Sequence, residues 1–159
     1  MQRNRIRTPI QDLIPAVIQK ISVGGTVEIT VPGNSMKPTL LDRVSRVRLK
    51  AIEDPKRGDM VLYRRDNGTY VLHRIVKESE DGTFVFCGDA QYQLEKGIRR
   101  EQMLAVVSDF SRRAKWRSCD DPVYQCWWRI CVQARGCRHL SAAVRRRIQK
   151  LYSELSGSA

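Results

Sequence analysis

Three residues whose types are common in hydrolytic sites lie far apart in the sequence: Ser35, His73 and Asp89. A serine hydroxyl attacks an amide only when a neighbouring group takes its proton. A histidine, whose ordinary pKa is about 6.5, can take that proton, and a carboxylate can orient the ring and stabilise the imidazolium. If the fold joins these positions, their chemistry is acyl transfer through a serine nucleophile.

The elements expected around these residues place each of them at the end or in the middle of a strand. Ser35 follows a strand-like run, 26–31, on a loop bracketed by Gly33 and Pro38. The runs 59–64 and 69–77 flank an Asn-Gly pair, which predicts a hairpin that carries His73 in its second strand. Further strands are expected over these ranges: 44–49, 83–87 and 103–107. The sequence therefore predicts a mainly β fold, compact and mostly antiparallel, with no room for βαβ crossovers.

Four short boxes occur in a fixed order in this region: 33–40 (GNSMKPTL), 57–61 (RGDMV), 71–75 (VLHRI) and 88–89 (GD). In order and spacing they resemble the boxes of type I signal peptidases, and the resemblance covers roughly residues 26 to 110. Bacterial signal peptidases and self-cleaving SOS-type repressors use a Ser/Lys pair. The endoplasmic-reticulum, archaeal and some Gram-positive enzymes have histidine at the base position, as this chain does at His73.

The resemblance implies a role for each matching residue. Ser35 is the expected nucleophile and His73 the expected general base. Asp89 is the first candidate for the carboxylate that orients His73. Glu95 is the alternative, because the histidine-type enzymes also carry a carboxylate several residues after the Gly-Asp box. Within the boxes, Gly88 and Asp59 are expected to shape the structure near the site, and a turn-forming role explains Asp59 equally well.

The resemblance also bears on the oxyanion site and the substrate pocket. The backbone N–H of Ser35 is the natural oxyanion donor. Many signal peptidases have a small hydroxyl residue three positions before the nucleophile, whereas this chain has Pro32, which offers no donor. Asn34 is the candidate for a substitute donor. Met36 is expected to pack beneath the site and to shape a pocket for small side chains.

The composition describes a basic globular protein. The chain has 159 residues, of which 42% are hydrophobic and 29% charged. This balance excludes wholesale disorder. Its 29 Lys and Arg against 17 Asp and Glu give a net charge of +12. Such an excess calls for an anionic partner: lipid head groups, nucleic acid or an acidic substrate.

No apolar run is long enough to span a bilayer and no signal peptide is recognised, so the expected location is cytoplasmic or peripheral at a membrane. Reduced thiols are expected for the five cysteines, at 87, 119, 126, 131 and 137. They lack the paired spacing of structural zinc sites, so neither a metal nor another cofactor is predicted. Of the two histidines, His139 is expected at the surface.

Three segments are expected: an N-terminal helix within 1–24, a β peptidase core over 25–110 and a basic helical extension over 111–159. The first helix is predicted to start at Thr8 and Pro9 and to place Ile10, Ile14 or Leu13, Val17, Ile18 and Ile21 on one face. That face either covers the core or lies on a bilayer surface as a remnant of a membrane anchor.

The extension carries eleven Lys and Arg and two acids between residues 111 and 150. One helix is expected over 122–136 and another over 140–155. Trp116, Trp127 and Trp128 beside arginines favour an anionic membrane surface over nucleic acid as the partner of residues 111–150, with packing on the core as the alternative.

The leading hypothesis is a serine endopeptidase that resembles type I signal peptidases and cleaves an extended peptide with small residues near the scissile bond. The alternative keeps the same fold but makes the chain a non-catalytic or self-processing module whose basic tail binds anionic lipid or nucleic acid.

Overall fold

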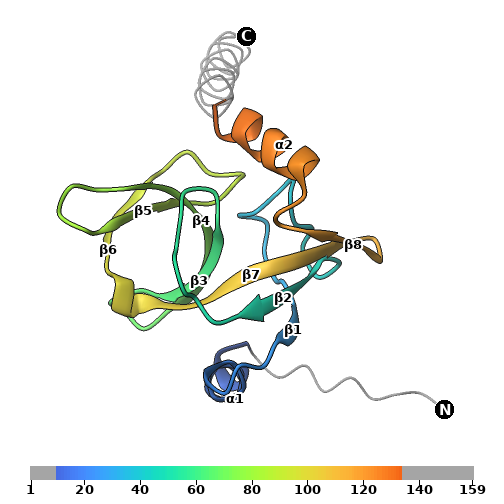
Figure 1. Ribbon diagram of the computed structural model, residues 1–159, viewed down its shortest axis with the longest axis horizontal. Coiled ribbons are helices and arrows are strands. Elements are labelled where there is room, and N and C mark those ends of the chain that lie inside the picture. Colours follow the sequence, from blue (N-terminus) through green and yellow to red (C-terminus); the bar gives the residue numbers. More distant parts are fainter. Residues whose placement is uncertain (1–9, 134–159) are drawn as a thin grey trace, which may run out of the picture.

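The structure is a computed structural model that describes residues 10–133, and it is mainly β (Figure 1). Helix α1 (Ile10–Ser22) comes first and α2 (Pro122–Gln133) last. Between them lie the strands β1 (Val27–Thr30), β2 (Arg46–Lys50), β3 (Met60–Arg64), β4 (Tyr70–Glu78), β5 (Phe84–Cys87), β6 (Glu95–Ile98), β7 (Met103–Arg112) and β8 (Lys115–Ser118), with the 3₁₀ turn η1 (Arg100–Gln102) before β7.

All of these strands belong to one antiparallel sheet with the order β1-β2-β7-β3-β4-β5-β6, and β8 pairs with β7. The predicted hairpin is confirmed: β3 and β4 pair from Met60↔Arg74 to Arg64↔Tyr70 around the Asn67-Gly68 turn. The long strand β7 joins the two halves of the sheet, because it pairs with β3 through its first residues and with β2 through its later ones. In Figure 1 it crosses the middle of the molecule.

The first four residues of β3, Met60 to Tyr63, are buried, which explains why apolar and aromatic residues follow one another there without alternation; only Arg64, at the end of the strand, is exposed. Met60 and Leu62 belong to one hydrophobic cluster, together with α1, β2 and α2. Val61 and Tyr63 point to the opposite face and belong to a second cluster, formed with β5 and β6. The candidate base is thus carried by a hairpin whose first strand is fixed by packing on two sides.

Helix α1 packs against the core rather than standing free. Ile14, Val17 and Ile21 are buried in the first cluster. Ile18 does not share this burial, because it lies at the edge of the apolar stripe and is exposed. The helix ends where predicted: Gly24 has a positive φ of 79° and its N–H bonds the carbonyl of Ile21. The proposed start at Thr8 lies outside the described residues.

The sheet continues past residue 110, where the change in composition suggested the end of the β core. Strand β7 reaches Arg112, and β8 returns along it with Phe110 opposite Arg117. Helix α2 begins at Pro122 as predicted, and its buried side chains, Tyr124 and Trp128, join the first cluster. The helix expected over 140–155 lies outside the described residues, as do Cys137 and His139.

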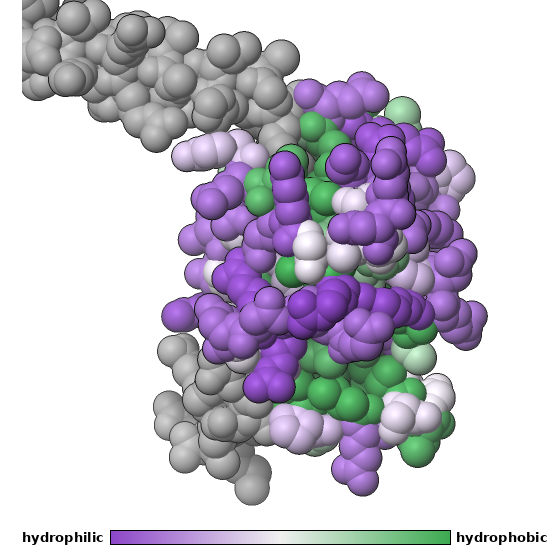
Figure 2. All heavy atoms as spheres, turned by 90° about the vertical axis from the view of Figure 1, so that its left-hand side faces the viewer, coloured by the Kyte–Doolittle hydropathy of each residue, from purple (hydrophilic) through white to green (hydrophobic). Residues whose placement is uncertain are grey.

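The surface is mostly polar. Figure 2 shows one side of the molecule covered largely by hydrophilic residues, with apolar residues gathered at its lower end, the level of α1 and β1 in Figure 1. The described helices, α1 and α2, have 13 and 12 residues, which is too few to span a bilayer.

Candidate active site

The loop that carries Ser35 is folded into tight turns. The N–H of Lys37 bonds the carbonyl of Asn34 at 3.1 Å, and the N–H of Leu40 bonds the carbonyl of Met36 at 2.9 Å. The start of the loop is held by a bond of 2.7 Å from the N–H of Gly33 to Asp42 Oδ1. Asn34 is exposed and Ser35 half-buried, so the serine lies at an ordered but accessible position.

The serine loop lies against the end of β5, next to the strand that carries His73. The carbonyl of Ser35 accepts a hydrogen bond of 2.8 Å from the N–H of Ala90. Ala90 follows closely on Cys87, which pairs with Arg74 in β4. A Cβ atom added to Gly88 would lie 2.6 Å from the Ser35 carbonyl oxygen, so only glycine permits this approach.

A buried arginine connects all four boxes. Arg74 has no exposed surface and forms a two-pronged ion pair with Asp89, at 2.8 Å from Nε to Oδ1 and 2.6 Å from Nη2 to Oδ2. Its Nη1 donates to the carbonyl of Gly58 at 2.7 Å. Asp89 in turn accepts a hydrogen bond from Thr39, on the serine loop. Because Arg74 adjoins His73, this network fixes the serine loop relative to the strand of the candidate base.

Helix α2 completes this network from outside the region of the boxes. Arg74 Nη1 donates a 2.9 Å hydrogen bond to the hydroxyl of Tyr124. The guanidinium also lies 5.5 Å from the ring centroid of Trp128. Trp128, which is 2% exposed, packs against Gly58, where an added Cβ would lie 2.3 Å from the indole. The sequence placed Trp128 at a membrane surface with the other tryptophans. That was wrong, because the indole belongs to the core.

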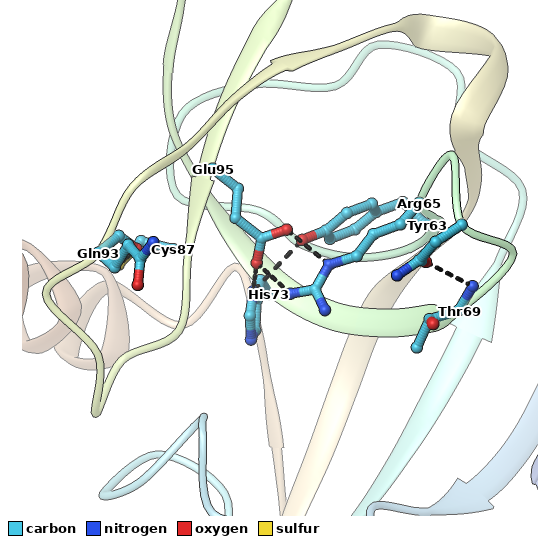
Figure 3. Close-up of polar contacts among 8 residues, drawn as sticks. Tyr63, Arg65, Thr69, His73, Cys87, Gln93 and Glu95 are labelled. Carbon is cyan, nitrogen blue, oxygen red and sulfur yellow. Dashed lines mark hydrogen bonds and ion pairs between the residues drawn. The ribbon is translucent and has the colours of Figure 1, made fainter.

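The carboxylate that contacts the ring of His73 is Glu95 rather than Asp89. His73 is 2% exposed, and its Nδ1 lies 3.0 Å from Glu95 Oε1 (Figure 3). From the sequence, Asp89 was the first candidate for the carboxylate that orients His73. Both oxygens of Asp89 are instead engaged by Arg74 and Thr39. The ranking is therefore reversed: Asp89 is a structural anchor, and the alternative residue holds the histidine ring.

Two residues that the sequence did not single out hold Glu95 in turn. Arg65 donates to both carboxylate oxygens, at 2.7 Å from Nε to Oε2 and 2.5 Å from Nη2 to Oε1. The hydroxyl of the buried Tyr63 lies 3.3 Å from His73 Nδ1 and also hydrogen-bonds Glu95. No spacing in the sequence indicates this contact, because it depends on β6 lying beside β5 with Phe86 opposite Glu95.

These surroundings set the charge states of the pair. Burial lowers the pKa of His73, and the nearby Arg65 lowers it further, although Glu95 acts in the opposite direction. Burial raises the pKa of Glu95, but the hydrogen bonds from Arg65 and Tyr63 outweigh it, so the net shift is downward. At neutral pH the site thus holds a neutral imidazole beside a carboxylate. Nδ1–H donates to Glu95, which leaves Nε2 as the acceptor.

A small apolar pocket of about 140 Å³ opens beside Ser35. Met36 forms part of its wall and is buried beneath the loop, as the sequence predicted. The remaining walls come from the end of β1, the start of the serine loop and the β3–β4 hairpin: Ile29, Val31, Pro32, Gly33, Leu62, Tyr70, Val71 and Leu72. Its size and lining suit a small apolar side chain.

Asp59 has the turn-forming role that was the alternative to catalysis. Its Oδ2 accepts a 2.9 Å hydrogen bond from the N–H of Lys56, and its carbonyl accepts one of 2.9 Å from the N–H of Ile75. Burial raises its pKa. These contacts close the turn before β3 and bring Gly58 to Arg74.

Comparisons of the chain with protein-family models, with curated proteins and with solved structures returned no match.

Proposed function

We propose that the chain is a serine endopeptidase with a fold of the signal-peptidase and repressor-peptidase type, in which Ser35 is the nucleophile, His73 the general base and Glu95 the orienting carboxylate. The observation that carries the proposal is the buried His73 ring, whose Nδ1 lies 3.0 Å from an ionised, doubly anchored Glu95. A neutral histidine fixed in this way is suited to accept a proton through Nε2. The serine loop is tied to the neighbouring strand by the contacts of Ala90 and Asp89.

In the proposed reaction, Ser35 Oγ attacks the carbonyl carbon of the scissile bond while its proton passes to His73 Nε2. Collapse of the tetrahedral intermediate breaks the C–N bond, and His73 returns the proton to the leaving amine. Water then attacks the acyl-enzyme, again with His73 as base, and releases the acid and Ser35. Throughout, Glu95 stabilises the transient imidazolium.

The backbone N–H of Ser35 is the proposed oxyanion donor, because within the described residues it has no hydrogen-bond partner. Pro32 lies in the pocket wall and adds no donor. The exposed side chain of Asn34 is the nearest candidate for a second one along the loop.

The sheet topology supports binding of the substrate as an added strand. Among the described strands, β1 pairs only with β2, and residues 70–73 of β4 pair only with β3. Both segments contribute to the pocket beside Ser35. A peptide laid between these unpaired edges would present a side chain to the pocket, and the volume of about 140 Å³ favours a small one.

A cleavage assay tests the proposal. The purified chain and its Ser35→Ala variant are incubated with a peptide library rich in small residues, and the products are read by mass spectrometry. Ser22→Ala is the matched control, because Ser22 is exposed and bonds only its own helix within the described residues. We expect cleavage by the wild type and the control and none by Ser35→Ala. Equal cleavage by all three would refute the nucleophile, and cleavage by none would favour a binding module of the same fold.

A further inference from the structure

A second surface combines exposed apolar and basic side chains, and its residues do not line the pocket of Ser35. It consists of the outer side of α2 and the β7–β8 hairpin, and we call it the α2–β8 surface; its residues are Arg112, Lys115, Trp116, Val123, Trp127 and Ile130. A pocket of about 410 Å³ lies between the hairpin and the helix, with Trp116 and Trp127 in its wall. In Figure 1 both elements project from the sheet, α2 upwards and the β7–β8 turn to the side.

The apolar part of this surface lies on one side of α2. Val123 and Ile130 are 67% and 60% exposed, and Trp127, between them in the sequence, is partly exposed. The spacing i, i+4, i+7 places these three residues along one helical stripe. The buried side chains of the helix, Tyr124 and Trp128, face the core, and the half-buried Trp127 packs against the edge of the same cluster. Two large aliphatic side chains are thus presented to the solvent on a helix that the core already holds.

The basic part lies on the hairpin. Among the described residues, Arg112 and Lys115 have no ion-pair partner, and both line the same pocket as the indoles. Trp116 is covered on one face by Arg48, whose guanidinium carbon lies 4.1 Å from the ring centroid. The positive charges are therefore next to the apolar stripe and are not neutralised within the described part of the chain.

From this combination we infer that the α2–β8 surface docks on a membrane that contains anionic lipids. Arg112 and Lys115 would contact the head groups, Trp127 would lie at the interface, and Val123 and Ile130 would enter the acyl boundary. Nucleic acid would satisfy the basic residues, but its phosphate backbone offers no apolar phase to the two exposed aliphatic side chains. The inference is independent of catalysis, because it uses no residue of the proposed Ser35–His73–Glu95 site.

Vesicle sedimentation with the full chain tests this inference. The vesicles are phosphatidylcholine alone or phosphatidylcholine with phosphatidylserine, and binding is measured at low and at physiological salt. We expect binding only to the anionic vesicles and less of it as salt is added. Neutralising both basic residues, in R112Q/K115Q, should lower the partition coefficient roughly 25-fold, since each charge contributes about five-fold. The equally charged control, K77Q/K96Q, changes exposed lysines of β4 and β6 and should bind like the wild type.

A second pair of variants tests the apolar stripe. V123S/I130S should reduce binding to anionic vesicles by about ten-fold or more. The control V23S/L94S, which changes exposed apolar residues elsewhere, should have no effect. Equal binding to both vesicle types, no binding, or unchanged binding by the R112Q/K115Q variant would overturn the inference. A large fall in the thermal stability of V123S/I130S would also overturn it, because another part of the chain would then cover the stripe. Binding of an oligonucleotide that only R112Q/K115Q weakens would assign the surface to nucleic acid.

Discussion

Replacing Glu95 by glutamine tests the assignment of the orienting carboxylate most sharply, because the change removes a charge and keeps the size of the side chain. In the proposed mechanism His73 takes the proton of Ser35, and a positive charge then forms on a ring whose Nδ1 is 3.0 Å from Glu95 Oε1. At an effective dielectric constant of about 20, this attraction is worth about 5 kcal/mol. Arg65, on the same carboxylate, opposes part of it. We therefore expect kcat/KM to fall roughly 10²- to 10³-fold, or about 3 to 4 kcal/mol.

The assay is peptide cleavage by Glu95→Gln, compared with Asp89→Asn, together with urea unfolding of both variants. The Glu95 variant should lose rate but little stability, because its ion pair with Arg65 is partly exposed. Asp89→Asn should instead lose roughly 3 to 5 kcal/mol of stability, because it leaves the fully buried charge of Arg74 uncompensated. A fall in rate of less than about ten-fold for Glu95→Gln would refute its assignment. The assignment would also be refuted if Asp89→Asn kept the stability of the wild type and lost much of its kcat/KM.

Further predictions concern the pH dependence, the contact of Gly88 with the serine loop, the ion pair of Arg65 with Glu95 and the packing of α2. Because burial lowers the pKa of His73, its folded value lies below the unfolded value of 6.5; kcat/KM should be on its plateau at pH 7 and fall only below pH 6.5. At these pH values His73 binds a proton more tightly in the unfolded chain than in the folded one, so the free energy of unfolding should decline as the pH falls from 6.5 towards the folded pKa of His73. Urea unfolding of the wild type and of His73→Asn over this pH range measures the decline. Gly88→Ala should displace the Ser35 carbonyl and lower kcat/KM about 100-fold with the fold retained by circular dichroism; unchanged kinetics would contradict the close approach. Arg65→Gln removes a positive charge that lowers the pKa of His73, so the acid limb of the pH profile of kcat/KM should move to higher pH. The limb of Arg65→Lys should lie between those of Arg65→Gln and the wild type. An unmoved limb would show that Arg65 does not influence His73. Tyr124→Phe removes an acceptor of Arg74 and should cost about 1.5 to 3 kcal/mol in urea unfolding, whereas a cost near zero would mean that α2 is not coupled to this network.

The order and pairing of the strands in the first hairpin could be predicted from local sequence. The Asn-Gly pair defines the β3–β4 turn, and the Asp81-Gly82 pair defines the next one. Period-two alternation is visible in β2, which has one buried and one outward face. Strands β6 and β8 could not be predicted, because local sequence does not indicate them. The four residues of β6, EKGI, contain a lysine and a glycine and show no alternation, so they form a strand only because a neighbouring strand pairs with them.

The part of the site that could be predicted is the part carried by the boxes. Ser35, His73 and Gly88 could be singled out as candidates because their local surroundings, a bracketed loop, a hairpin strand and a Gly-Asp turn, are short and continuous in sequence. The carboxylate could only be narrowed to two candidates. Arg74 decides between them, because it adjoins the candidate base and takes both oxygens of Asp89. A buried arginine has no signature in a sequence that contains many exposed ones.

The tryptophans show the same limit in the C-terminal part. Aromatic residues beside arginines are expected equally for an interface and for a core edge. Trp128 lies one helical turn from Tyr124, and together they cover Gly58 and Arg74, whereas Trp127 is half-buried and packs only against the edge of the cluster. The helical period alone allowed either Trp127 or Trp128 to face the core. The contact of Gly58 with the indole of Trp128 shows that Trp128 is the buried one.

Activation of Ser35 by His73 can be measured by covalent labelling with a serine-directed phosphonate, followed by location of the adduct by peptide mass spectrometry. We expect one adduct, on Ser35, in the wild type and its near-complete loss in His73→Gln, since the hydroxyl is inert without the base. An adduct that forms on Ser35 equally fast in His73→Gln, or labelling of other serines alone, would contradict this activation.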